Sequence, residues 1–159
     1  MIVKFFDLKH NTLNQNKLIL FYGDNEGLKN EETLKITENH KINILEEKDI
    51  LENKEIFFNN LYSGSLFENE KFFVIKRSTD KIVKIIEELK LENINDTIII
   101  INSGVLEKKS KLRSLFEKDK KFICVAFYPD TGATLSKLAN TFLREKKIMI
   151  SQSDINLII

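Results

Sequence analysis

Five short apolar runs constrain the fold of this chain more than any other feature of its sequence. They are continuous in Ile, Val, Leu and Phe rather than alternating with polar residues, which is typical of strands buried on both faces. The five runs occupy residues 18–22, 42–45, 72–76, 97–102 and 122–127. Because helical patterns separate them, right-handed strand–helix–strand crossovers are expected. The sequence therefore predicts an α/β fold in which a three-layer parallel sheet is flanked by helices.

Four segments carry apolar residues at the spacing of amphipathic helices. The first, at residues 55–63, is expected to end at Gly64, because glycine often follows the last residue of a helix. Thr79 is placed to cap the second helix. The residues expected to face inward are Phe58, Leu61 and Tyr62 in the first helix, Ile82, Val83, Ile86 and Leu89 in the second, Leu112, Leu115 and Phe116 in the third, and Leu135, Leu138, Ala139 and Leu143 in a helix at 134–145.

Composition narrows the functional class without deciding it. The chain has 159 residues and a formal net charge of +1, which gives no overall argument for binding to nucleic acid or to an anionic membrane. No apolar run is long enough to span a membrane, and residues 1–9 lack the apolar core of a signal peptide. The single cysteine, Cys124, excludes an internal disulfide and suits a reducing cytosol, so a cytoplasmic location is expected. His10 and His40 have no partner at metal-ligand spacing, and neither a metal nor a cofactor is predicted.

The junction after the first apolar run is where a nucleotide-binding α/β protein carries the pattern G-x-x-x-x-G-K-[ST]. Gly23 and Lys29 match it, but Leu28 replaces the second glycine and Asn30 replaces the hydroxyl residue. A Cβ at position 28 obstructs the approach of backbone N–H groups to phosphates, and the missing hydroxyl removes a magnesium ligand. The sequence favours a plain strand–turn–helix junction. The alternative is a divergent nucleotide-binding enzyme or switch that uses Lys29.

The tetrad Ser65-Leu66-Phe67-Glu68 places two large apolar side chains between a predicted helix and a predicted strand. An apolar pair on a connection is a candidate anchor for a pocket on a partner protein. The alternative is that Leu66 continues the inward stripe of the preceding helix. The same four residues recur at 114–117, inside a predicted helix, where the apolar pair is expected to be core.

The segment at residues 107–121 is rich in lysine, but acidic residues interleave it and its apolar residues have helical spacing. A solvated outer helix face is the favoured interpretation. The alternative is a nucleic-acid-binding domain that uses Lys108, Lys109, Lys111 and Arg113.

Together these segments resemble the N-terminal part of the delta subunit of bacterial DNA polymerase III, a component of the clamp loader. The resemblance is carried by the order and spacing of four pieces. They are Leu-Ile-Leu-Phe-Tyr-Gly-Asp-Asn-Glu at 18–26, Ser65-Leu66-Phe67 before a strand, Leu-Glu-Lys-Lys-Ser-Lys-Leu at 106–112, and the segment 135–142. The resemblance implies an AAA+-like core without a working phosphate loop and without catalysis of its own, although the family is classed with the nucleotidyltransferase DNA polymerases.

The resemblance also implies a function in DNA replication. Such subunits open the ring-shaped beta sliding clamp, partly by inserting a Leu-Phe pair into a hydrophobic pocket of the clamp. These roles carry over to Leu66 and Phe67, with Ser65 preceding them, whereas Tyr62, Ser63 and Gly64 stand where some relatives have a glutamine. Other clamp-loader subunits would be partners, and DNA would be contacted indirectly through the complex.

The resemblance predicts two domains. Residues 1–145 would form the clamp-binding domain, and residues 146–159 would begin a truncated helical lid domain. Ser151 or Ser153 is placed to cap the lid helix, and the apolar residues 155–159 are expected to be poorly anchored because little of that domain is present.

Overall fold

The computed structural model describes residues 2–4, 17–37, 40–63, 70–91 and 97–159, without the side chains of 2–4 and 91. The chain divides into two compact units, Met1–Phe127 and Tyr128–Ile159. This boundary falls before the helix at 132–145, whereas the sequence placed that helix in the first domain.

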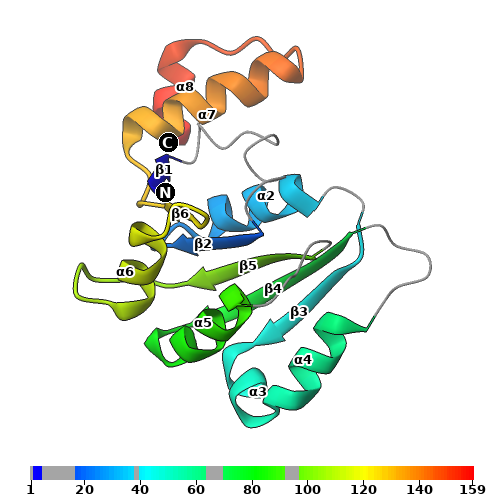
Figure 1. Cartoon of the computed structure of the whole chain (residues 1–159). Coiled ribbons are helices and arrows are strands. Elements are labelled where there is room, and N and C mark those ends of the chain that lie inside the picture. Colours follow the sequence, from blue (N-terminus) through cyan, green and yellow to red (C-terminus); the bar gives the residue numbers. More distant parts are fainter. Residues whose placement is uncertain (1, 5–16, 38–39, 64–69, 92–96) are drawn as a thin grey trace. The chain divides into compact units, whose positions relative to one another are not determined.

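The first unit is built on a parallel sheet, as the sequence predicted (Figure 1). Six described strands follow the order β1-β6-β2-β5-β4-β3. Their bounds are β1 (Ile2–Lys4), β2 (Leu18–Tyr22), β3 (Ile42–Glu46), β4 (Lys71–Ser78), β5 (Thr97–Ser103) and β6 (Ile123–Ala126). All five predicted strands are present. The sequence missed β1, which is only three residues long and pairs with β6 through Ile2 opposite Cys124.

Helices cover both faces of this sheet, which gives three layers. The helices of the first unit are α2 (Glu26–Thr37), α3 (Glu47–Glu52), α4 (Lys54–Tyr62), the 3-10 turn η2 (Asp80–Ile82), α5 (Val83–Leu91) and α6 (Lys111–Lys118). One hydrophobic cluster lies between the sheet and α3, α4, α5 and α6, and includes Leu20, Ile75 and Ile101. A second lies on the opposite face under α2, and includes Phe21 and Ile100. Neighbouring residues of a central strand are therefore buried on opposite faces, which explains the continuous apolar runs.

Most of the predicted inward residues of this unit pack in its core. Those that are buried as expected are Leu61, Ile82, Ile86, Leu89, Leu112 and Phe116, whereas Phe58, Val83 and Leu115 are half-buried. The prediction for Tyr62 is wrong, because its side chain is 48% exposed. The buried stripe of α4 instead runs through Phe57 and Leu61, four residues apart on one helix face.

The second unit is a pair of helices. Helix α7 (Gly132–Glu145) begins with a capping box between Thr131 and Thr134, and α8 (Gln152–Ile158) follows Ser151, whose hydroxyl accepts the N–H of Asp154. Of the stripe predicted to face inward on α7, Leu135, Ala139 and Leu143 are half-buried, whereas the prediction for Leu138 is wrong, because it is 54% exposed. A unit of two short helices offers little area for burial.

No helix in the described part of the chain has the length and apolar character needed to cross a bilayer.

Candidate functional site

The turn after β2 explains the glycine that matches the phosphate-loop pattern. Gly23 has φ +122°, and a Cβ placed there would lie 2.1 Å from the carbonyl oxygen of Phe127. Its N–H donates to the carbonyl of Gly104 at 3.0 Å, while the N–H of Phe127 donates to the carbonyl of Tyr22 at 2.8 Å. Gly23 is therefore required by the close approach of β2 to the end of β6, independently of any ligand.

Helix α2 begins too early for a phosphate-binding loop to form. It starts at Glu26, so Leu28 and Lys29 lie within its first turns rather than on a loop. The side-chain oxygen of Asn25 accepts the N–H of Leu28 at 3.0 Å, and the carbonyl of Asn25 accepts the N–H of Lys29 at 3.0 Å. Backbone donors that would bind phosphate at such a junction are thus engaged within the chain.

Lys29 is bound by the protein itself. Only 1% of the residue is exposed, and its ammonium donates to the carbonyl of Ser103 at 2.7 Å and to a carboxylate oxygen of Glu26 at 2.5 Å. The hydroxyl of Ser103 in turn donates to the carbonyl of Ser78 at 2.6 Å. This chain of hydrogen bonds joins α2 to the ends of β5 and β4. It argues against Lys29 as a phosphate ligand, because the ammonium would have to break both contacts.

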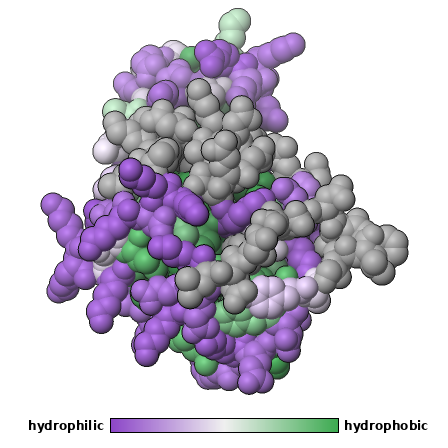
Figure 2. All heavy atoms as spheres, viewed as in Figure 1, coloured by the Kyte–Doolittle hydropathy of each residue, from purple (hydrophilic) through white to green (hydrophobic). Residues whose placement is uncertain are grey.

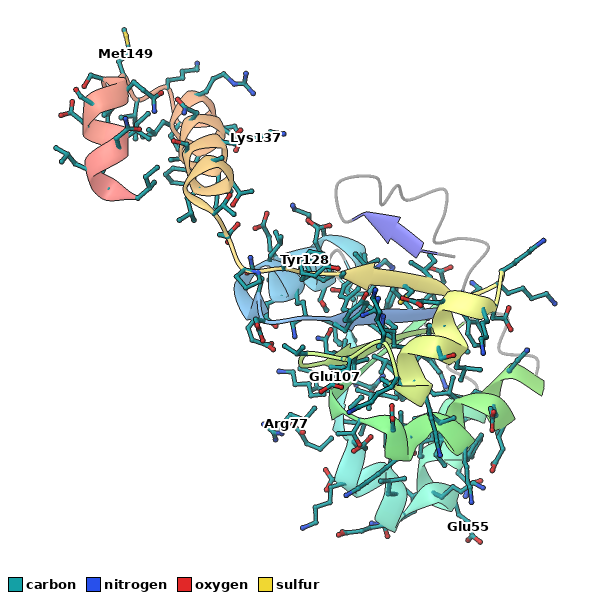
Figure 3. The ribbon with its side chains drawn as sticks, turned by 90° about the vertical axis from the view of Figure 1, so that its left-hand side faces the viewer. Glu55, Arg77, Glu107, Tyr128, Lys137 and Met149 are labelled. Atoms are coloured by element: carbon teal, nitrogen blue, oxygen red, sulfur yellow. The ribbon has the colours of Figure 1, made fainter. Side chains whose placement is uncertain are left out.

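The neighbouring strand ends do not supply the carboxylate that holds magnesium in an ATPase. Strand β4 ends in Lys76, Arg77 and Ser78, with a bulge between Ile75 and Ser78. Arg77 has φ +54°, and its guanidinium pairs with Glu46 at 2.8 Å while its side chain projects outward (Figure 3).

The end of β5 carries Asn102 and Ser103 rather than a carboxylate. The buried side-chain oxygen of Asn102 has no hydrogen-bond partner among the residues that the structure describes. Among the described residues, no group of three or more His, Cys, Asp or Glu side chains is placed to hold a metal ion.

The loop after β4 is fixed by two carboxylates. Buried Glu47 accepts the N–H of Thr79 at 2.7 Å and its hydroxyl at 2.9 Å. Asp80 accepts the hydroxyl of Ser110 at 2.6 Å and the N–H groups of Leu112 and Lys111 at 3.0 and 3.1 Å. These hydrogen bonds hold the pKa of Asp80 below its ordinary value, and the one from Ser110 has the largest effect. The first turn of α6 is therefore already satisfied by a carboxylate of the protein.

The predicted clamp-binding residues Ser65, Leu66 and Phe67 lie outside the described residues, but the helix before them is described. Helix α4 ends at Tyr62, and Ser63 has extended backbone with φ −60° and ψ 116°. The ring of buried Phe57 contacts Phe73 of β4 at a centroid distance of 6.2 Å.

Of the two Ser-Leu-Phe-Glu tetrads, the structure describes the second, which lies in α6. In the second copy Phe116 is fully buried and Leu115 packs against the same core, so the prediction that this pair is core is confirmed.

Sequence reasoning missed the hydrogen bonds that join the ends of β4 and β5 to α2, α3 and α6. The hydroxyl of Ser110 accepts the N–H of Arg113 at 3.2 Å, and a serine directly before a helical pattern is a recognisable capping signal. The roles of Glu47, Asp80 and Ser103 have no such signal, because their partners are 25 to 74 residues away in the sequence.

These features define an α/β protein with a parallel sheet whose strand–helix junction resembles a nucleotide site but is closed by its own side chains. Among solved structures, the chain is similar to the Bacillus subtilis DNA clamp loader delta protein (YqeN), with a TM-score of 0.65 and 12% sequence identity. The match covers 96% of this chain and 50% of that protein, so the chain spans about half its length. At this identity the similarity shows the fold. No model of a known protein family matches the chain, and no curated protein matches it in sequence.

Proposed function

We propose that this chain is a delta-type clamp-loader subunit that binds and opens a ring-shaped sliding clamp during DNA replication. The observation that carries the proposal is that Lys29, in a fold similar to that of a clamp-loader delta protein, is hydrogen-bonded to Glu26 and to the Ser103 carbonyl of the same chain. A subunit with this closed junction would act by binding rather than by catalysis. ATP would act on neighbouring subunits of the loader, and DNA would be engaged by the complex.

We place the clamp contact at Ser65, Leu66 and Phe67. The rival interpretation, in which Leu66 continues the inward stripe of α4, requires that helix to extend beyond Tyr62. The end of α4 at Tyr62 and the extended backbone of Ser63 favour a connection instead. Two large apolar side chains on a connection can enter a pocket, and their burial would contribute about 1.5–3 kcal/mol each.

Clamp opening would follow from differential binding. If the pair binds the open form of the ring more tightly than the closed form, the subunit shifts the equilibrium of the ring by that difference. A shift from mostly closed to mostly open requires about 5 kcal/mol of preference, which exceeds what either side chain supplies alone. The proposal therefore assigns the two residues a joint role.

The test is binding to the cognate sliding clamp, measured by surface plasmon resonance with the full chain. Replacing both Leu66 and Phe67 by alanine should weaken binding at least about 100-fold, which corresponds to roughly 3 kcal/mol, and should leave the melting temperature nearly unchanged.

The matched control replaces Leu115 and Phe116, the same dipeptide in α6. That variant should lose a few kcal/mol of stability, because Phe116 is fully buried. Unfolding by the first double variant, or unchanged clamp affinity, would overturn the assignment of the contact. Absence of binding by the wild-type chain would overturn the proposed function.

A further inference from the structure

Helix α4 ends without a basic residue of its own. Its last turn contains no lysine or arginine, although the final carbonyl groups of a helix carry partial negative charge. The N–H of Ser63 donates to the carbonyl of Asn59 at 2.8 Å, and the hydroxyl of Ser63 donates to the carbonyl of Asn60 at 2.9 Å. These hydrogen bonds order the last turn, but they bring no positive charge to it.

The cation at this helix end comes from β4. The ammonium of Lys71 donates to the carbonyl of Ser63, to the carbonyl of Asn60 at 3.3 Å and to the hydroxyl oxygen of Ser63 at 3.4 Å. Lys71 is half-buried and is the first residue of β4. A lysine at the C-terminus of a helix is favourable, because it donates to the last carbonyls and opposes the helix dipole. Lys71 therefore caps α4 from outside the helix.

The backbone of Lys71 is fixed by the sheet. Lys71 pairs with Thr97 of β5, next to the sheet centre. The preceding residue, Glu70, forms an ion pair with Lys17 at 3.8 Å, and the carbonyl of Lys17 accepts the N–H of Ile99 at 2.8 Å. The start of β4 is thus a fixed point from which the Lys71 side chain reaches the end of α4.

One side chain therefore joins the two ends of the segment 64–70. Ser63 directly precedes this segment and Lys71 directly follows it. The end of α4 and the start of β4 lie on the same side of the first unit (Figure 1). A contact between the two ends of a short segment reduces the number of conformations that the chain between them can adopt. The residues proposed to contact the clamp, Leu66 and Phe67, belong to this segment.

The surface of α4 near this end is partly apolar. Ile56 and Tyr62 are 59% and 48% exposed. Figure 2 shows hydrophobic side chains between hydrophilic ones in the lower part of the view, where α3 and α4 lie in Figure 1. A helix end that carries exposed apolar side chains suits contact with another protein.

We infer that Lys71 is a positioning residue for the clamp contact. Its ammonium would restrain the segment 64–70, so that Leu66 and Phe67 meet the clamp in a narrow set of conformations. This inference rests on the proposed function. The apparent affinity of a chain that binds from one conformation is its intrinsic affinity multiplied by the population of that conformation. Lys71 would raise this population without touching the clamp.

The inference has a kinetic signature. Loss of the restraint lowers the population of binding-competent free chain, so the association rate falls, whereas the bound segment is held by the clamp and leaves as before. Most substitutions in an interface change the dissociation rate instead. We expect an effect of about five- to tenfold, because partial exposure to solvent weakens a charged hydrogen bond.

The experiment measures association and dissociation rates of the full chain on the cognate sliding clamp by surface plasmon resonance. Lys71→Met keeps the apolar stem of the side chain but removes the ammonium, and Lys71→Arg restores a cationic donor. The matched control is Lys54→Met at the start of α4, where Lys54 pairs with Glu88 of α5 at 2.6 Å. This control removes an ion pair from the opposite end of the same helix. Thermal melts establish that all three variants fold.

Hydrogen exchange of the free chain on the millisecond scale gives a second measurement that needs no clamp. The amides of residues 64–70 should exchange at least about threefold faster in Lys71→Met than in the wild type, and they should be unchanged in Lys54→Met.

Lys71→Met should bind about five- to tenfold more weakly through a slower association rate, with a dissociation rate within about twofold of the wild type. Lys71→Arg and Lys54→Met should stay within about twofold of the wild type in both rates. Unchanged affinity of Lys71→Met, a loss confined to the dissociation rate, or an equal loss in Lys54→Met would overturn the inference and leave the clamp contact in place.

Failure of the wild type to bind the clamp is a different outcome, because it overturns the proposed function. The exchange measurement then decides the role of Lys71 by itself. Faster exchange at 64–70 in Lys71→Met would support the restraint, and unchanged exchange would overturn it.

Discussion

Replacement of Lys29 by methionine tests whether its ammonium is structural. Methionine keeps most of the volume of the side chain but cannot donate to the Ser103 carbonyl or to Glu26. A hydrogen bond that involves a charged group contributes about 1.5–3 kcal/mol, and a buried carbonyl that loses its donor costs about 1–3 kcal/mol. Part of this loss is recovered, because methionine removes the cost of desolvating a charge. Glu26 adds little, since its side chain is 68% exposed and returns to water.

The expected result for Lys29→Met is a loss of about 2 kcal/mol in the free energy of unfolding, or about 4–8 °C in melting temperature. Urea denaturation and a thermal melt measure both quantities. Lys84→Met, at an exposed lysine of α5, is the control and should stay within about 0.5 kcal/mol of the wild type.

The same variant separates the structural role from a nucleotide-binding one. Calorimetry of the wild type with Mg-ATP should show no saturable heat below millimolar concentration, because the donors of the junction are engaged internally. Unchanged stability of Lys29→Met, or micromolar ATP binding that the substitution abolishes, would refute the reasoning.

Four further predictions follow from the described contacts. Gly23→Ala should destabilise the chain by about 2–4 kcal/mol in urea denaturation, because the added Cβ meets the Phe127 carbonyl and the backbone has positive φ; wild-type stability would contradict this. The pKa of Asp80 in the folded chain lies below its ordinary value of 3.8. The contribution of the Asp80 carboxylate to the free energy of unfolding is therefore complete above that pH, and it is lost as the pH falls through the lower folded pKa. Asp80→Asn should make the free energy of unfolding depend less on pH in the acid range. Burial raises the pKa of Cys124 to about 12, so its thiol should react with a disulfide reagent at pH 8 far more slowly in the native than in the denatured chain. Amide hydrogens at 156–159 should exchange faster than those of β6, because Leu157 and Ile158 are 85% and 70% exposed; equal protection would mean that this helix end is anchored.

The second unit exposes several large apolar side chains. Leu138, Phe142, Met149, Leu157 and Ile158 are all more than half exposed, and the side chain of Met149 projects into solvent (Figure 3). Ile155 is the only buried residue of this unit, which is described throughout. The expectation that residues 155–159 are poorly anchored stays a prediction; Leu157 and Ile158 are exposed, whereas Ile155 is buried.

The sequence by itself determined the class of fold. Continuous apolar runs separated by amphipathic segments produce a parallel sheet with helices on both faces, because strand residues buried on both sides cannot alternate with polar ones. The same local reasoning identified the buried faces of α5 and α6, where periodicity and packing agree. It also predicted that the Gly23–Lys29 junction departs from a phosphate loop, since Leu28 and Asn30 are readable from the pattern alone.

The tertiary structure decided what periodicity cannot encode. Tyr62 fits an inward stripe on α4, yet Phe57 is the residue that is buried, because the orientation of a helix is set by what it packs against. Strand β1 exists through pairing with β6, a contact over more than 100 residues of sequence. The partners of Lys29 and Asp80 likewise come from distant segments. Asp119, after α6, pairs with Lys90 of α5 at 2.6 Å. Hydrogen bonds and ion pairs between remote segments form only once the chain has folded, which is why the closed junction at Lys29 and the capping of α6 by Asp80 required the structure.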